Sequence, residues 1–237
     1  MASFDEKRIS DPVHGTIGLS KLEVEIINTP AFQRLRNVKQ LGLAHMVYPG
    51  ADYSRFSHSI GVCHVVGRLM EALRLQKTGG IDEATMQQYR LAGLLHDVGH
   101  YPFSHAMEDA LDEHFSRKSL RSRSTELGDP SLEQVPDSEA MTHERVGKRI
   151  VESDPMISEI LRRADVDPQK VTEIFTRERK LDYSNVVSSD LDADRIDYLL
   201  RTAHHTGLPY GSTDLNYLVT QVRLDNVGRV CFSNRAW

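Results

Sequence analysis

The apolar residues of this chain recur every three or four positions over most of its length, which is the spacing of one face of an α-helix. Between residues 57 and 75 the pattern predicts a long helix with one buried side. Asp82 is suited to cap a following helix that ends near Gly99. Further helices are predicted in 19–43, where Pro30 begins a second one, and at 143–152, 155–164 and 188–205. We therefore predict an all-α fold, a helical bundle.

Two stretches depart from the helical pattern. Residues 116–141 are rich in serine, charged residues, glycine and proline and contain few large apolar side chains, which predicts a mobile loop. In residues 221–232, apolar and polar side chains alternate on both sides of a turn, which predicts a short β-hairpin near the C-terminus. We expect one domain over 1–217. It is followed at 218–237 by the start of a C-terminal segment that continues beyond Trp237.

The composition excludes several classes of protein. A content of 39% hydrophobic and 27% charged residues is that of a globular protein. With a net charge of -5 the chain is not a polycation built to coat nucleic acid, so a nucleic-acid partner is possible but not indicated. Cys63 and Cys231 are too few for a disulfide framework and form no zinc motif. The charged N-terminus resembles no signal peptide, and no stretch is apolar for long enough to span a membrane. We expect a cytoplasmic protein without a membrane partner.

The run Leu95–His100, with the sequence LHDVGH, carries the strongest chemical signal. Imidazole and carboxylate are both good ligands for divalent first-row metals. Adjacent helical residues diverge by about 100°, so His96 and Asp97 can converge on one ion only near a helix end. Gly99 and Pro102 supply such an end. A single His-Asp pair would more often be a structural feature of a helix C-terminus.

The pair has partners elsewhere in the chain. His58 begins the predicted helix at 57–75, and Asp194 lies on the helix predicted at 188–205. Two imidazoles and two carboxylates on separate helices form a four-ligand set that accommodates manganese, iron, cobalt, nickel or zinc. We therefore predict a metal site at His58, His96, Asp97 and Asp194.

These residues belong to six blocks that occur in the order DPVHGTIGL, TPAFQRLRNVKQLG, RFSHSIGV, HDVGHYPFSH, THE and DADRIDYLLR. The blocks resemble those of the HD-superfamily deoxynucleoside triphosphate triphosphohydrolases, which include the vertebrate enzyme that joins a sterile-alpha-motif domain to an HD domain. The resemblance covers 7–217 except 116–141. It implies an HD-domain fold and metal-dependent cleavage of a dNTP to a deoxynucleoside and inorganic triphosphate. It also implies that the protein forms a homo-oligomer. In addition to the transition metal, a magnesium ion is expected to accompany the triphosphate.

The resemblance places His100, His105, Glu108 and His143 in the active site, with His105 and His143 near the phosphates. His100 is four residues after His96, on the same face if the helix continues. His105 is expected to open a new short helix on which Glu108 can orient its ring. A water activated by the metal would attack the α-phosphorus, and His105 would protonate the departing 5′-oxygen. The other histidines are expected to be packed or at the surface: His14, His45, His64, His114, His204 and His205.

Five further residues match substrate contacts of that family. Arg55 and Arg195 correspond to contacts with the α-phosphate and the γ-phosphate, where cations are needed against a polyanion. Tyr198 corresponds to a tyrosine that stacks on the sugar, and Gln40 to a residue that binds the 3′-hydroxyl. Thr202 stands where the vertebrate enzyme has an aspartate that also binds this hydroxyl, which weakens the expected selection for deoxyribose.

The family's regulatory nucleotide site is matched only in part. Gln33 and Arg36 are retained, but Asn28 replaces an aspartate that recognises guanine. An amide offers one acceptor and one donor where guanine presents two donors. We therefore expect weak or absent activation by GTP.

Two other functions stay open at this point. The chain could hydrolyse another phosphoester, such as a nucleoside mono- or diphosphate, a modified nucleotide or a cyclic dinucleotide, and Thr202 keeps this alternative open. It could also be a nucleotide sensor without activity, against which the intact ligands together with His105 and His143 argue.

Overall fold

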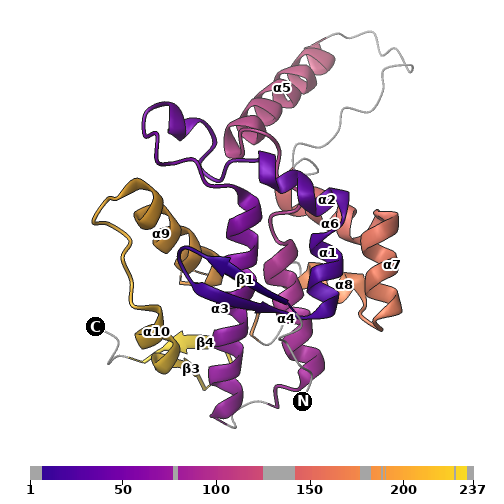
Figure 1. Ribbon diagram of the computed structural model, residues 1–237. Helices are drawn as coiled ribbons and strands as arrows, with labels where there is room; N and C mark the ends of the chain where they lie inside the picture. The colour runs from indigo at the N-terminus through magenta and orange to yellow at the C-terminus, as the bar shows by residue number, and fades with distance from the viewer. Residues whose placement is uncertain are drawn as a thin grey trace.

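The computed structural model describes residues 7–76, 80–124, 142–176, 183–187, 189, 191–226 and 228–233, with the backbone alone given for 116–124 and 184. At its centre, α3 (Arg55–Leu75) and α4 (Glu83–Leu95) lie side by side (Figure 1). Ser54 caps α3 by accepting from the backbone N–H of Ser57, and Asp82 caps α4 as predicted. Most residues of α3 are buried, so this helix is the axis of the hydrophobic core.

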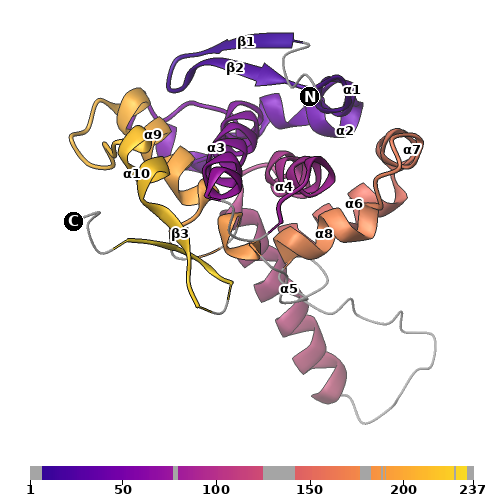
Figure 2. The same ribbon diagram turned by 90° about the horizontal axis from the view of Figure 1, so that it is seen from below.

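Other helices surround this pair on two sides. On one side α9 (Ala193–Thr206) packs against α3, and on the other α8 (Pro168–Thr176) packs against α4 (Figure 2). Next to α8 lie α6 (His143–Ser153) and α7 (Pro155–Arg163). Gly207 ends α9 in the left-handed conformation that favours glycine. The predicted helical bundle is therefore confirmed.

The N-terminal region contains short elements. The hairpin of β1 (Lys7–Asp11) and β2 (Gly15–Leu19) is antiparallel and was not predicted from the sequence. It is followed by α1 (Lys21–Ile27), α2 (Pro30–Gln33) and the 3₁₀ turns η1 (Arg34–Asn37) and η2 (Gly42–Met46). Pro30 begins a helix as predicted, but this helix is a single turn that continues as η1.

The C-terminal region contains the predicted hairpin, formed by β3 (Val222–Leu224) and β4 (Val230–Phe232). Before it lies α10 (Leu215–Gln221), which the sequence analysis did not predict, and a short turn η4 (Ser184–Val186) precedes α9. Leu218 and Val222 are buried in the same core as the helices. The domain boundary after 217 stays a prediction.

Three predicted bounds are corrected. The helix α5 (His105–Ser124) is long rather than short, so the loop predicted from 116 is wrong for 116–124, and 125–141 lies outside the described residues. The helix α4 ends at Leu95, before the end that was predicted near Gly99. The helix α9 begins at Ala193, after the start that was predicted near 188. Among the residues that the structure describes, no helix combines the length and the apolar character needed to cross a bilayer.

Candidate active site

The four predicted metal ligands converge from three helices. His58 lies in the first turn of α3, His96 is the C-cap of α4, and Asp194 lies in the first turn of α9. His58 Nε2 is 2.9 Å from Asp194 Oδ1 and 3.6 Å from Asp97 Oδ2. His96 Nε2 is 3.4 Å from Asp97 Oδ1 and 3.8 Å from Asp194 Oδ1. Ligand atoms that share one first-row ion at about 2.1 Å are separated by roughly 3–3.5 Å. Ligand atoms of His58, His96 and Asp97 all lie within 4.8 Å of one another, a spacing that fits one divalent ion, and Asp194 Oδ1 lies beside both imidazoles.

The hydrogen bonding of the two imidazoles also fits an ion. His58 Nδ1 contacts Asp197 Oδ2 at 2.7 Å, and His96 Nδ1 contacts the Gly93 carbonyl at 2.8 Å. Both acceptors require a proton on Nδ1, which leaves a lone pair on each Nε2. Both Nε2 atoms are buried; that of His96 has no hydrogen-bond partner among the described residues, and that of His58 lies 2.9 Å from Asp194 Oδ1, itself a predicted ligand. Metal-binding histidines have this arrangement, with the outer nitrogen bonded to a carboxylate or a carbonyl.

The electrostatics of this site favour a positive charge. Burial by itself would lower the pKa of His58, but the hydrogen bonds and charges of Asp194 and Asp197 raise it to about 9. Burial would raise the pKa of Asp97, but the adjacent Arg55 guanidinium and the neighbouring histidines hold it well below its usual range. A divalent cation bound here would balance the negative charges of Asp97 and Asp194, and it would replace the extra proton on His58.

Arg55 connects this site to the loop that follows α4. Its side chain is buried, and Nη1 donates to Asp97 Oδ2 at 2.5 Å while Nε donates to Ser104 Oγ at 3.0 Å. Arg34 donates to the carbonyls of His100, at 2.7 Å, and of Val98. Arg55 therefore holds this loop against the start of α3, and Arg34 holds it against η1.

His100 corrects one detail of the sequence analysis. The helix ends at Leu95, so His100 lies on this loop and not on a helical face shared with His96. It still reaches the site, with Nε2 at 3.3 Å from Asp97 Oδ1. Gly99 makes the loop compact, because a Cβ there would lie 2.0 Å from the His143 carbonyl oxygen. The missing side chain lets α6 approach the metal ligands.

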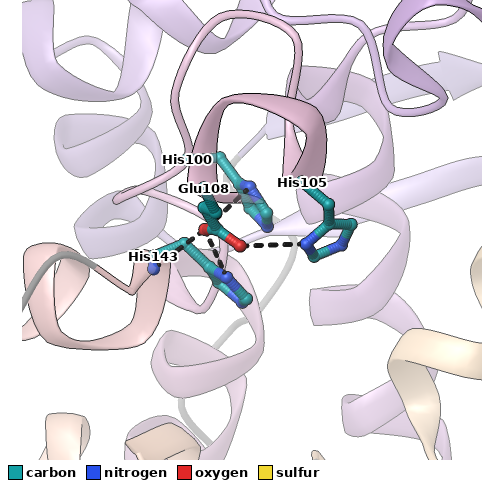
Figure 3. A group of neighbouring side chains, drawn as sticks. All are labelled: His100, His105, Glu108 and His143. Carbon is teal, nitrogen blue, oxygen red and sulfur yellow. Dashed lines mark hydrogen bonds and ion pairs between the residues drawn. The ribbon is translucent and has the colours of Figure 1, made fainter. Parts of the chain in front are cut away.

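A second cluster is formed by His100, His105, Glu108 and His143 (Figure 3). His100 joins it to the predicted ligand Asp97. Glu108, in the first turn of α5, accepts from His105 Nδ1 at 3.0 Å and from His143 Nδ1 at 2.8 Å. It also accepts from the His143 backbone N–H at 2.9 Å. The rings of His100 and His143 are stacked, with centroids 3.8 Å apart and planes 14° apart. One carboxylate therefore orients two histidines.

The charges in this histidine–glutamate cluster are set unequally. Burial would raise the pKa of Glu108, but hydrogen bonds from His105 and His143 hold it well below its usual range. Burial would lower the pKa of His143, but Glu108 raises it above its ordinary value. Burial lowers the pKa of His100 to about 4, despite Asp97. His143 therefore keeps its proton to a higher pH than an ordinary imidazole does, while His100 is neutral at neutral pH.

The stacking argues against a second ion in this cluster. A metal bound to an imidazole nitrogen lies in the plane of the ring. The rings of His100 and His143 are nearly parallel and 3.8 Å apart, so no point near both rings lies in both planes. An ion shared by His100 and His143 is therefore excluded by this geometry, and the hydrogen bonds of Glu108 suit the cluster to hold a proton.

Both groups face one cavity of about 430 Å³. Among the predicted substrate residues, Gln40, Arg55 and Tyr198 line it. Within the described part of the chain, Arg195 and Thr202 are not in its lining. Arg195 is exposed, and the Thr202 hydroxyl is 2.8 Å from the Tyr53 hydroxyl. Three of the five predicted substrate residues are therefore brought to the metal ligands, and two are not.

The predicted regulatory residues lie apart from this cavity. Asn28 ends α1 and is exposed. Gln33 donates to the Ile27 carbonyl at 2.7 Å and accepts from Arg36 Nε at 2.8 Å, and the Arg36 guanidinium lies 3.6 Å from the centroid of the Phe56 ring. These residues share one surface of the N-terminal helices, and a nucleotide site there stays a prediction.

The sequence analysis missed the residues behind His58. Asp197 and Arg201 on α9 are fully buried and hydrogen bonded to each other, and His14 from the β1–β2 turn contacts the same carboxylate at 2.6 Å. His14 was expected to be packed or at the surface; its side chain is buried, but it also joins this network. The one available signal was the spacing of Asp194, Asp197 and Arg201, which places three charged residues on one helical face.

Known proteins are similar to this chain in sequence and in fold. An uncharacterized protein of Mycoplasma pneumoniae is 34% identical over 236 residues, which are 95% of this chain and 50% of that protein. Deoxynucleoside triphosphate triphosphohydrolase SAMHD1 of Xenopus laevis is 34% identical over 224 residues, or 85% of this chain and 34% of the relative. The chain spans about half the length, or less, of the curated relatives it matches.

A solved structure agrees over nearly the whole chain. The crystal structure of a phosphohydrolase from Bacteroides thetaiotaomicron superimposes with a TM-score of 0.74 at 28% identity, covering 97% of this chain and 50% of the other. The HD domain matches residues 55–201, a span that begins at Arg55, ends at Arg201 and contains all four converging ligands. With more than half of its length in this match, the chain belongs to the HD-domain family.

Proposed function

We propose that this protein is a metal-dependent phosphohydrolase that cleaves deoxynucleoside triphosphates to a deoxynucleoside and inorganic triphosphate. The observation that carries the proposal is the shared cavity. The cavity is lined by three of the predicted ligands, by the three histidines of the histidine–glutamate cluster and by the buried Arg55: His96, Asp97, Asp194, His100, His105 and His143. His58 and Glu108 lie behind this lining, in contact with Asp194 and His143. A site that joins a cation, a guanidinium and a proton donor is suited to phosphoryl chemistry.

Each group has a distinct part in the proposed reaction. A divalent ion held by the four ligands would act as a Lewis acid and activate water for attack on the α-phosphorus. A new bond forms between the water oxygen and phosphorus, and the bond from phosphorus to the 5′-oxygen breaks. The departing oxygen takes its proton from His143, and Glu108 keeps that proton on His143 before the reaction.

The sequence analysis favoured His105 as the proton donor, but we propose His143 for this role. The side chain of His105 is 65% exposed, whereas that of His143 is 18% exposed and lies between Glu108 and the stacked ring of His100. The carboxylate of Glu108 raises the pKa of His143 against the effect of burial, and its hydrogen bond fixes the orientation of the ring. We propose that His105 assists by orienting Glu108.

The cavity has features for the rest of a nucleotide. Its volume falls within the range of about 300–1,000 Å³ that is usual for small-molecule sites. The side-chain oxygen of Gln40 is buried without a hydrogen-bond partner in the described residues, so it can accept from a sugar hydroxyl. Tyr198 supplies an aromatic wall. The relative from Xenopus laevis is named for dNTP hydrolysis, and the Bacteroides protein is named a phosphohydrolase, which supports this class of substrate.

Hydrolysis of another nucleotide phosphoester is the second candidate, and one contact favours it. Because Thr202 and Tyr53 share a hydrogen bond, the hydroxyl of Thr202 is occupied outside the cavity lining. Selection of the sugar would then depend largely on Gln40, and ribonucleotides or shorter phosphates would be rejected less strongly.

Product analysis decides between these candidates. Purified protein loaded with manganese is incubated with dNTPs, NTPs and nucleoside mono- and diphosphates, and the phosphate products are separated. We expect inorganic triphosphate from dNTPs. Release of orthophosphate or pyrophosphate from another nucleotide, with dNTPs left intact, would support the second candidate and contradict the first.

A further inference from the structure

Asp197 is the centre of a buried network behind the metal ligands. Its side chain is fully buried, and Oδ2 accepts from His58 Nδ1 at 2.7 Å and from Arg201 Nε at 3.0 Å. Oδ1 accepts from Arg201 Nη2 at 3.0 Å and from His14 Nε2 at 2.6 Å. The Arg201 guanidinium contacts both oxygens of Asp197, which is the pairing of an ionised carboxylate. Asp197 is therefore an acceptor only, and His14 and His58 are donors to it.

The chain is arranged to bring His14 to this position. Asp11 accepts from the backbone N–H groups of Val13 and His14, each at 2.9 Å, which shapes the β1–β2 turn. The other oxygen of Asp11 accepts from Arg201 Nη1 at 2.9 Å, which joins the turn to α9.

Space for Asp197 comes from Gly61 on α3, since a Cβ there would lie 1.9 Å from Asp197 Oδ1. The hairpin turn, α3 and α9 thus meet at one carboxylate.

His14 acts on the metal ligand through this carboxylate. The orientation of the His58 ring follows the position of Asp197 Oδ2, and the position of Asp197 follows the donors on both of its oxygens. Without the His14 donor, Oδ1 keeps only Arg201, and the carboxylate can rotate about its side-chain bonds. We propose that His14 is a positioning residue of the metal centre, through which the N-terminal hairpin sets metal affinity. This inference rests on the proposed metal site but not on the identity of the substrate.

The test compares two substitutions at His14 by their affinity for Mn²⁺ alone. His14→Phe keeps an aromatic ring against His64, whose centroid is 5.2 Å away, but removes the donor. His14→Gln keeps an N–H donor near the position of Nε2. Loss of the group bonded directly to a ligand, here Asp197, typically weakens metal binding by about 10–100-fold. Because His14 lies one contact further out, we expect an increase of about 10-fold, the lower end of that range, in the Mn²⁺ dissociation constant for His14→Phe, and a change of at most about two-fold for His14→Gln.

His64→Phe is the matched control, because it changes the other ring of the pair without touching Asp197. Melting of the metal-free proteins is measured alongside. A merely structural role would lower the Tm of metal-free His14→Phe and leave its Mn²⁺ affinity unchanged, which would overturn the proposal. Equal weakening by the Phe and Gln variants would overturn it as well, because the donor would then not be responsible.

The wild-type protein supplies a test that survives a folding defect in the variants. Nitrogen-15 NMR of labelled histidines reports which ring nitrogen carries the proton. We expect His14 to carry it on Nε2 and its ring signals to shift on saturation with Zn²⁺, although His14 is not a ligand. A proton on Nδ1 alone contradicts the inference. Wild-type protein that binds neither Mn²⁺ nor Zn²⁺ contradicts the proposed function itself, which distinguishes the two failures.

Discussion

The metal-ligand set and the histidine–glutamate cluster face the same cavity but are built differently. His58, His96 and Asp97 are buried where the central helices α3 and α4 meet, and their outer contacts are buried as well. The cluster forms where a loop, the start of α5 and the start of α6 meet, and His105 is largely exposed. The core helices fix the ligand positions, whereas one carboxylate, Glu108, organises the cluster. Removing a ligand should therefore abolish binding, while changes in the cluster should alter the rate.

The largest effect is expected from the ligands. His96→Ala or Asp97→Ala removes one of the proposed metal-ligand atoms from the centre of the site, so we expect loss of both bound metal and hydrolysis. Metal content by elemental analysis and turnover of a dNTP check this. His45→Ala, which changes a half-buried histidine outside both groups, should keep both. Full activity in a metal-free His96→Ala protein would contradict the ligand assignment.

A smaller loss is expected from the cluster. His143→Ala should lower kcat by about 10²–10⁴-fold, the usual range for a general acid, while bound metal is retained. His105→Ala should cost clearly less, because Glu108 and His143 still contact each other. Steady-state kinetics of the two metal-loaded variants give the comparison. A greater loss for His105→Ala would return the proton to His105, as the sequence analysis expected.

The pH dependence should separate the cluster from the ligands. Glu108 raises the pKa of His143, so the acid form, and with it kcat, is lost only as the pH rises through a value above 6.5. Glu108→Gln removes the carboxylate, which lowers the pKa of His143 and moves this alkaline limb to lower pH. Metal affinity at fixed pH should change little. An unmoved limb would show that His143 is not the group that titrates.

Arg55 lies between the two regions and should affect both modestly. Its guanidinium contacts Asp97 and lines the cavity, so Arg55→Ala should weaken substrate binding and raise KM. Arg55→Lys, which keeps the charge but loses the paired donors, should recover part of the affinity. A variant with unchanged KM would remove Arg55 from the substrate site.

The smallest effect is expected at the surface of Asn28, Gln33 and Arg36. Since an amide at 28 cannot serve guanine as a carboxylate would, GTP should activate dNTP hydrolysis weakly or not at all. Initial rates with and without GTP measure this. A large, saturable activation that disappears in Arg36→Ala would contradict the reasoning.

The sequence predicted the helical bundle because apolar residues recur at helical spacing along most of the chain. His58, His96 and Asp194 lie at helix ends, where local sequence signals were sufficient to place them, and their role as metal ligands stays a prediction. The His14–Asp197 contact joins residues 183 positions apart, and the occupied hydroxyl of Thr202 depends on Tyr53, 149 positions away. No local pattern encodes such contacts. The extension of α5 was missed because its polar composition is also that of a loop.

Hydrolysis in water enriched in oxygen-18 tests the joint action of the two regions most directly. The metal-loaded protein cleaves a dNTP in H₂¹⁸O, and mass spectrometry locates the label in the products. Attack on the α-phosphorus with departure of the 5′-oxygen predicts a single heavy oxygen in inorganic triphosphate and none in the deoxynucleoside. Label in orthophosphate or pyrophosphate, or in the deoxynucleoside, would contradict the account.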